Sequence, residues 1–363
     1  MLSKALVVGA YQRKLEELAR CGEIELTCVV PPSWRGAGGV ERLERAHTAG
    51  YRLLVRPIRF NGQFHLFHWL GLDEVFAAVR PDIVHVDEEP YNLATALALR
   101  LAERHGARAL FFTWQNLYRR YPPPFSWWEH AAYRRAAWAL AGNCEAVAVL
   151  RRKGYRGPAS VIPQFGVDPA VFRPRPRQPR AEFVVGYAGR LVPEKGLLLL
   201  LEAVQALAPP WRLELVGSGP LAAGVQARAT ALGIADRVRL RPPVPSTDMP
   251  AVIAGWDTLA LPSLTRPNWK EQFGRILIEA MACGVPCVGS TCGEIPHVLG
   301  DAGLVVPEGD AAALAAALAR LQVDAALREE LAARGRTRVL ARYTQRRVAE
   351  QTYAVYRRLM AAA

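Results

Sequence analysis

Residues 271–310 have the sequence EQFGRILIEAMACGVPCVGSTCGEIPHVLGDAGLVVPEGD. Glu271 and Glu279 stand on either side of a Phe-Gly pair at 273–274, and an apolar run, VPCVGS, follows at 285–290. We predict that a helix begins near Phe273, so that its free backbone N–H groups and the positive end of its dipole face an anionic group. Glu279 then lies about two helical turns, roughly 10 Å, beyond Glu271. Ionised carboxylates only accept hydrogen bonds, so the segment predicts a site for an elongated ligand with anionic and hydroxyl groups.

Outward from this segment, short apolar runs alternate with helix-length segments. In the first half these runs occupy 5–9, 24–30, 51–56, 82–86 and 109–113, and in the second half 182–189, 211–217, 237–241, 256–262, 285–290 and 303–306. Strands that are almost continuously apolar are typical of a parallel sheet covered on both faces. The sequence therefore predicts two doubly wound α/β domains.

The predicted boundary between the domains is rich in arginine and proline. Residues 172–182, FRPRPRQPRAE, contain four Arg and three Pro, a composition typical of an extended linker. We predict an N-terminal domain over 1–172, a linker over 173–182 and a C-terminal domain over 183–342, followed by an amphipathic helix over 343–363. Ligands of such sheets bind outside the carboxyl ends of the strands, so we expect the active site in the cleft between the domains.

Composition favours a large protein outside the membrane. The chain has 363 residues, 51% of them apolar, which is enough for two cores. Its longest unbroken aliphatic run, 197–201, is far shorter than the ~18 residues of a membrane span. We interpret the opening MLSKALVVGAYQRKLEE as a first strand and not as a signal peptide. Six cysteines without close pairing indicate thiols in a reducing compartment, so we expect a cytoplasmic protein.

The net charge of +13 favours an anionic partner, which could be nucleic acid, an anionic membrane surface or a nucleotide-linked substrate. The arginines are scattered and no nucleic-acid-binding motif is present, so we expect no nucleic acid. A genomic base bias toward Arg and Ala is a second explanation of the charge. Zinc ligation by Cys283, Cys287, Cys292 and His297 is disfavoured, because their spacings are not the usual two-residue ones.

The pieces EQFG, EAMACG, GVP and GEIP occur together and in one order. This pattern closely resembles the E-x7-E element of the retaining nucleotide-sugar glycosyltransferases of family 4. The resemblance covers about residues 160–345 well and the N-terminal half loosely. It implies an α/β GT-B fold, in which two Rossmann-like domains face each other across a cleft and the final helix over 343–363 packs back on the first domain. It also implies a hexosyltransferase that moves a sugar from a UDP- or GDP-type donor to a hydroxyl acceptor with retention, in polysaccharide, glycolipid or glycoconjugate synthesis. The nucleotide sugar is a substrate, and no separate cofactor is expected.

Four donor-side residues lie in two loops that follow predicted strands. The segment 189–196, GRLVPEKG, resembles the family loop in which Arg190 and Lys195 bind the donor diphosphate. An arginine guanidinium can donate two hydrogen bonds to two phosphate oxygens, and the flexible ammonium of a lysine can stay close to the negative charge that develops on the leaving group. A solvated surface loop is the alternative. Gly189 and, in the next such loop, Gly217 allow close backbone approach.

Within the E-x7-E element the resemblance assigns Glu271 to the transferred sugar and Glu279 to the nucleotide ribose. Glu271, Arg190 and Lys195 are thus the implied catalytic residues. The backbone N–H groups of Phe273, Gly274 and Arg275 would lie against sugar and phosphate. Arg275 stands where an aliphatic residue is usual, as either a third diphosphate cation or a salt-bridged surface residue, and Gln272, Glu294 and His297 also depart from the usual pattern.

The acceptor side has weaker signals. Gln115 stands where the family often has a His that lines the sugar pocket; glutamine can bind a hydroxyl but cannot take its proton. His85, within a predicted strand, is a second candidate, with packing in the core as the alternative. Glu88 belongs to an acidic cluster, Asp87 to Glu89, at the end of that strand. No Asp-x-Asp is present, which argues against a metal-dependent transferase.

Three alternatives stay open. Residues 118–138 mix Arg, Tyr and Trp, and they include a predicted helix that starts with a Ser126–Glu129 capping box. This segment suits either peripheral contact with the inner membrane face or ordinary packing of that helix, on which Trp128 and Trp138 share one face. A nucleotide-sugar epimerase or hydrolase could use the same two domains. A catalytically silent nucleotide-binding domain is the interpretation outside enzymes, and Gln115 is the residue that favours it.

Overall fold

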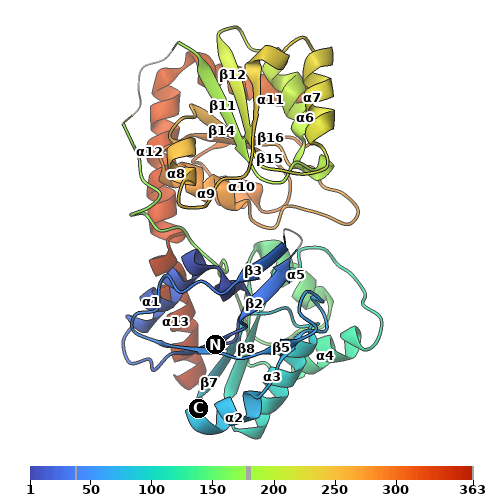
Figure 1. The fold of residues 1–363 in the computed structure, drawn as a ribbon, viewed down its shortest axis with the longest axis vertical. Coiled ribbons are helices and arrows are strands. Elements are labelled where there is room, and N and C mark those ends of the chain that lie inside the picture. The colour runs from blue at the N-terminus through green and yellow to red at the C-terminus, as the bar shows by residue number, and fades with distance from the viewer. Residues whose placement is uncertain (37–38, 177–180, 362–363) are drawn as a thin grey trace. The chain divides into compact units, whose positions relative to one another are not determined.

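The computed structural model describes residues 1–36, 39–176 and 181–361. The chain forms two compact units (Figure 1): unit 1 is Met1–Gly166 with Gln345–Ala363, and unit 2 is Val167–Thr344. Residues 177–180 of the expected linker lie outside the described residues.

Unit 2 contains a parallel sheet in the order β13-β12-β11-β14-β15-β16. Its strands are β11 (Phe183–Ala188), β12 (Trp211–Val216), β13 (Val238–Arg241), β14 (Thr258–Leu261), β15 (Cys287–Ser290) and β16 (Leu304–Val306). The chain starts in the middle of the sheet, runs to one edge and then returns to build the other half. The winding therefore reverses between β11 and β14, and ligands of doubly wound sheets bind at the carboxyl ends of the strands at such a point.

Helices cover both faces of this sheet. They are α6 (Leu197–Gln205), α7 (Ala222–Ala231), α8 (Met249–Ile253), α9 (Arg275–Ala282), α10 (Ile295–Leu299), α11 (Ala311–Val323) and α12 (Ala325–Arg342), with 3-10 turns η3 (Pro193–Lys195) and η4 (Ala235–Arg237). Figure 1 shows α6 and α7 on one side and α8, α9 and α12 on the other. Every residue of β14 and β15 is buried, which explains their continuous apolar sequence.

Unit 1 is also built on parallel strands, in the orders β1-β4 and β10-β9-β8-β7, which Leu2 joins through bridges to both Val29 and Val86. The strands are β1 (Thr27–Val30), β4 (Arg52–Val55), β7 (Ile83–Val86), β8 (Arg108–Thr113), β9 (Trp138–Ala141) and β10 (Ala159–Val161). Two small antiparallel pairs were not predicted, namely β2 (Ser33–Gly36) with β3 (Gly39–Arg42) and β5 (Ile58–Arg59) with β6 (His68–Trp69).

The helices of unit 1 include one from the far end of the chain. They are α1 (Arg13–Ala19), α2 (Leu72–Val79), α3 (Leu93–Arg104), α4 (Phe125–Arg135), α5 (Cys144–Arg152) and α13 (Gln345–Ala361). The last of these lies beside α1 (Figure 1), and its buried Val348 and Val355 belong to the same core cluster as Leu15 of α1. None of the described helices combines the length and the apolar content that crossing a membrane requires.

The predicted first strand at 5–9 is wrong. Residues Ala5–Val7 and Gly9–Gln12 form 3-10 turns, η1 and η2. Leu2 takes the strand position, because its N–H donates to His85 O at 2.8 Å and its carbonyl accepts from Asp87 N at 2.9 Å. The two buried residues Leu6 and Val7 made the turn resemble a strand. The shift places Lys4 at the carboxyl end of the strand position, whereas the prediction had it at the amino end.

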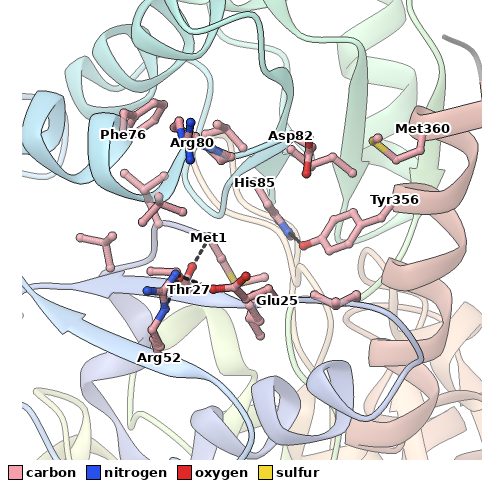
Figure 2. Close-up of a pocket in the computed structure, with 18 of the residues that line it drawn as sticks. Met1, Glu25, Thr27, Arg52, Phe76, Arg80, Asp82, His85, Tyr356 and Met360 are labelled. Atoms are coloured by element: carbon pink, nitrogen blue, oxygen red, sulfur yellow. Dashed lines mark hydrogen bonds and ion pairs between the residues drawn. The ribbon is translucent and has the colours of Figure 1, made fainter.

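Toward the amino end of this position, a pocket of about 750 Å³ lies between β1 and β7. Figure 2 shows Phe76 and Arg80 on one side of it, Arg52 on another, and His85 with Tyr356 at a third. The N-terminal amine of Met1 donates to Thr27 O at 2.7 Å at the floor of the pocket.

The predicted helix over 126–138 is shorter in the structure. Helix α4 ends at Arg135, and Trp138 begins β9, so Trp138 does not share a helical face with Trp128. The predicted capping box is also absent: Pro124 is the N-cap residue, and Ser126 lies inside the first turn.

Candidate active site

Close backbone contacts build the candidate site at the carboxyl ends of β11, β12 and β14. A Cβ atom added at Gly217 would lie 1.9 Å from the carbonyl oxygen of Gly189, so the loops after β11 and β12 are in direct contact only because residue 217 is glycine. Gly196 has φ +68, and a Cβ atom there would lie 2.0 Å from the carbonyl oxygen of Pro262, just after β14. The loop 189–196 is thereby held over the point where the winding of the sheet reverses.

This loop brings Lys195 to Glu271. The Lys195 Nζ lies 2.5 Å from Glu271 Oε2, and Ser263 Oγ donates to the same oxygen at 2.9 Å. The ring of Trp269 lies under the ammonium, 4.8 Å from Nζ to the ring centroid. Two of the three implied catalytic residues are therefore in contact.

The backbone of Glu271 is supported by the GEIP segment. Its carbonyl oxygen accepts from Glu294 N at 3.2 Å, and a Cβ atom added at Gly293 would lie 1.9 Å from that oxygen. The N–H of Glu271 donates to Cys292 Sγ at 3.5 Å. Cys292 thus meets the backbone of the predicted sugar-binding residue, and the GEIP motif has a structural function beside it.

Arg190 is the third implied catalytic residue, and its side chain is 64% exposed. Its nearest acidic partner is Glu194, at 3.6 Å. The guanidinium therefore extends from the loop into solvent, while the ammonium of Lys195 is nearly enclosed.

Helix α9 begins at Arg275, two residues after the predicted start. Its N-cap residue, Gly274, has φ 76, and no side chain caps the first turn. The Arg275 Nε donates to Glu279 Oε1 at 2.6 Å, so Arg275 forms a salt bridge along the helix. Burial raises the pKa of Glu279, and the charge of Arg275 opposes that rise. Phe273 is buried with its ring 5.7 Å from the ring of Tyr343.

His85 of unit 1 lies in the core. It is 1% exposed, and its Nδ1 shares a hydrogen bond of 2.7 Å with the hydroxyl of Tyr356. Burial pushes the pKa of His85 well below its ordinary value, so the ring is uncharged at neutral pH. Its Nε2 lies 4.0 Å from Asp87 Oδ1, and both side chains are 1% exposed, which agrees with the packed-core alternative.

Glu88 is buried and forms an ion pair with Lys4. The Lys4 ammonium also lies above the rings of Phe64 and Phe67, 4.5 and 5.1 Å from their centroids. Sequence reasoning missed Lys4, because the misplaced first strand put it at the opposite end of the sheet.

Neighbouring Glu89 secures the turn that follows β8. It accepts from Thr113 Oγ1 at 2.6 Å and from Trp114 N at 2.8 Å. Burial raises the pKa of Glu89 to about 7. At neutral pH the Glu89 carboxyl group is therefore protonated in part of the molecules and ionised in the rest.

Gln115 lies in a buried polar cluster and is 8% exposed. Its Oε1 accepts from Lys153 Nζ at 3.1 Å, and its Nε2 donates to the hydroxyl of Tyr121 at 3.3 Å. Lys153 in turn pairs with Glu129 at 2.6 Å. The contact of Tyr121, Lys153 and Glu129 with the Gln115 cluster was not predicted, because these residues meet only through the tertiary fold.

A half-buried histidine, His65, was also missed. The rings that surround it lie 5.1 to 5.9 Å from its centroid and belong to Phe64, Tyr91, Tyr121 and Phe125. Burial lowers the pKa of His65. It is the histidine that lies beside the hydroxyl-bearing side chains of the Gln115 cluster, in contrast to His85.

Residues 170–338 match the family "Glycosyl transferases group 1". These residues form a domain of the group 1 glycosyltransferases. Its sequence is 29% identical over 349 residues to a GDP-mannose-dependent alpha-(1-6)-phosphatidylinositol monomannoside mannosyltransferase of Mycolicibacterium smegmatis, across 87% of this chain and 86% of that one. It is 36% identical over 186 residues to a D-inositol 3-phosphate glycosyltransferase of Mycobacterium marinum, across 47% of this chain and 37% of that one. The match thus spans well under half of that second relative.

Two solved structures share the fold over nearly the whole length. A glycosyltransferase from Rickettsia africae superposes with a TM-score of 0.76 at 16% identity, covering 99% of this chain and 97% of that one. Anabaena HepE, solved in complex with UDP, superposes with a TM-score of 0.74 at 18% identity, covering 98% of each chain. The predicted GT-B fold class and membership of the retaining family 4 glycosyltransferases are confirmed. The protein is a hexosyltransferase that uses a nucleotide-sugar donor and a hydroxyl acceptor.

Proposed function

We propose that unit 2 binds the donor at the carboxyl ends of β11 and β14 and that unit 1 binds the acceptor. The observation that carries this proposal is the contact of Lys195 with Glu271 at the point where the winding of the sheet reverses. A nucleoside diphosphate sugar offers anionic oxygens to the lysine and hydroxyl groups to the glutamate. Each group can therefore exchange its present partner for the ligand.

In this scheme Lys195, Arg190 and the N–H groups of Phe273, Gly274 and Arg275 stabilise the departing diphosphate. Fixed positive groups aimed at developing negative charge usually give the largest single contribution to such a step. Glu271 orients the hydroxyl groups of the transferred sugar, and Glu279 binds the ribose after release from Arg275. The leaving phosphate oxygen accepts the proton of the acceptor hydroxyl, so no side chain of this protein is needed as a base.

For the acceptor we propose a hydroxyl group on an inositol or sugar ring. Support comes from the names of the two relatives, one acting on a phosphatidylinositol monomannoside and the other on D-inositol 3-phosphate. Gln115 and Tyr121, which follow β8, carry hydrogen-bonding groups that suit such a ring.

A peripheral membrane contact through α4 fits an acceptor that carries lipid. Trp127 of this helix is 66% exposed, and the segment before it contains Arg119 and Arg120. An exposed aromatic side chain near basic residues suits a headgroup region. Trp127→Ser should co-sediment less than the wild type with vesicles that contain phosphatidylinositol. With purely zwitterionic vesicles the two proteins should co-sediment to the same extent.

A panel of donors tests the proposal. Thermal unfolding with UDP, GDP and their sugar conjugates should show stabilisation by one nucleotide class. Transfer from that donor to inositol or phosphatidylinositol acceptors should then yield a product with the donor's anomeric configuration. Release of free sugar at the same rate with and without acceptor would contradict the proposed acceptor, and no stabilisation by either nucleotide would contradict the donor site.

A further inference from the structure

A short turn after β14 holds an aromatic side chain that the proposed reaction has not used. Arg266 and Trp269 exchange two backbone hydrogen bonds, N to O at 2.8 and 3.2 Å, around the pair Pro267–Asn268. A proline at the second position of a four-residue turn restricts its backbone. The position of Trp269 is therefore set by a closed turn.

The turn is anchored in the body of unit 2. Just before it, Leu264 N donates to Glu194 O at 2.8 Å, and Thr265 binds Glu308 through its N–H at 2.5 Å and through its hydroxyl at 2.9 Å. Glu194 precedes Lys195 in η3, so the Trp269 turn and the lysine loop are joined by their backbones.

Trp269 is half-buried, unlike Trp211 and Trp256, which lie in the core. The centroid of its indole ring lies 4.8 Å from the Lys195 ammonium, which also forms a salt bridge of 2.5 Å with Glu271. Lys195 is thus held by one charged group and one neutral ring. The face of an aromatic ring attracts a cation through the quadrupole of the ring, and this attraction is strongest for tryptophan.

We propose that Trp269 is a positioning residue for Lys195, which keeps the ammonium at the donor diphosphate when Glu271 turns to the sugar. This inference rests on the proposed donor site. A carboxylate would compete with phosphate for the lysine, because both are anions. The uncharged ring stabilises the ammonium without repelling the diphosphate, so it can remain in contact throughout the reaction.

The test is a double-mutant cycle on nucleoside diphosphate binding. The dissociation constant of UDP or GDP, whichever binds, is measured by calorimetry for the wild type, Trp269→Leu, Lys195→Met and the double variant. Trp269→Leu should weaken binding about three- to tenfold, the size of a partly desolvated cation–π contact. Trp269→Phe, which keeps a ring face, should retain most of the affinity.

Two readouts separate positioning from a general structural role. Binding of the free nucleoside, uridine or guanosine, should be the same in Trp269→Leu and the wild type, because no phosphate is present for Lys195. In the Lys195→Met background, Trp269→Leu should change diphosphate affinity less than twofold. An undiminished effect in that background, or an equal loss for the nucleoside, would overturn the inference and leave the donor site intact. If Lys195→Met itself binds the diphosphate as well as the wild type, the proposed donor site is wrong and the inference falls with it.

Discussion

Both units contain a lysine–glutamate pair near the end of a sheet, and the two pairs differ in their surroundings. In unit 2, Lys195 and Glu271 lie 2.5 Å apart, with side chains 14% and 9% exposed, between a serine hydroxyl and the ring of Trp269. In unit 1, Lys153 and Glu129 lie 2.6 Å apart and are each 5% exposed. The second pair also binds the side chain of Gln115.

From this difference we expect the first pair to bind a ligand and the second pair to stabilise the structure. Glu271 and Lys195 come from two loops at the reversal of the sheet, where a ligand can replace either partner. Lys153 follows α5 and Glu129 lies within α4, so their contact joins two helices and the turn after β8. We therefore expect variants of the first pair to change activity and variants of the second to change stability.

The largest effect is expected at the donor pair. Lys195→Ala should lower the transfer rate by about 100- to 1000-fold, because it removes a charge from the place where negative charge develops. Its thermal midpoint should fall less than that of Lys153→Met, because Glu271 keeps the hydroxyl of Ser263 as a hydrogen-bond partner. Initial rates at saturating donor and a melting curve check both expectations. A transfer rate within tenfold of that of the wild type would contradict the proposal that Lys195 and Glu271 serve activity and Lys153 and Glu129 serve stability.

The second effect concerns the stability of unit 1. Lys153→Met leaves Glu129 buried without its partner, which should lower the free energy of unfolding by about 3 to 5 kcal/mol. The double variant Lys153→Met/Glu129→Gln removes the unpaired charge and should recover part of that loss. Urea unfolding measures all three proteins. Equal stability of Lys153→Met and the wild type would show that this pair is not structural.

The third prediction separates the two glutamates within the donor region. Glu279→Gln should weaken binding of free nucleoside diphosphate by about 1 to 3 kcal/mol, the usual value of a hydrogen bond to a charged group. Glu271→Gln should retain that affinity and lose transfer activity. Calorimetry and rate measurements with one donor suffice. The reverse result would invert the orientation of the donor.

The fourth prediction uses the raised pKa of Glu89, about 7 in the folded protein against 4.5 as the ordinary value. Since the folded state binds the proton more tightly, stability should fall as pH rises from about 4.5 to 7. Residue 89 cannot titrate in Glu89→Gln. The free energy of unfolding of this variant should therefore fall less than that of the wild type over that range, and the two losses should differ by about 1 to 3 kcal/mol. Parallel pH dependences of unfolding in the two proteins would contradict this account.

The smallest expected effect is that of a chelator on transfer. Arg190 and Lys195 provide the positive charge that a divalent ion would otherwise supply at the diphosphate. Transfer should proceed at an unchanged rate in excess EDTA. Loss of activity that magnesium or manganese restores would mean that the lysine–glutamate pair works with a metal ion.

The amino-acid sequence by itself determined the sheet of unit 2 and predicted the residues of its candidate site. Its six strands were predicted because each is a short run rich in β-branched and other apolar residues, either continuous as in β14 or alternating with charged residues as in β12, and such signals are local. Lys195, Glu271 and Glu279 were found for the same reason, since each lies in a motif of eight or nine residues. Helix α9 began within two residues of its predicted start.

The tertiary structure alone decided the interior of unit 1. His85 meets Tyr356 across 271 positions of the chain, and Gln115 meets Lys153 across 38. The first strand was misplaced because Leu6 and Val7 are as buried in a 3-10 turn as they would be in a strand, and only the backbone hydrogen bonds of Leu2 identify the strand position. Apolar periodicity reports that a residue is buried. It does not report which distant residue it contacts, and in unit 1 those contacts determine which side chains lie near the site.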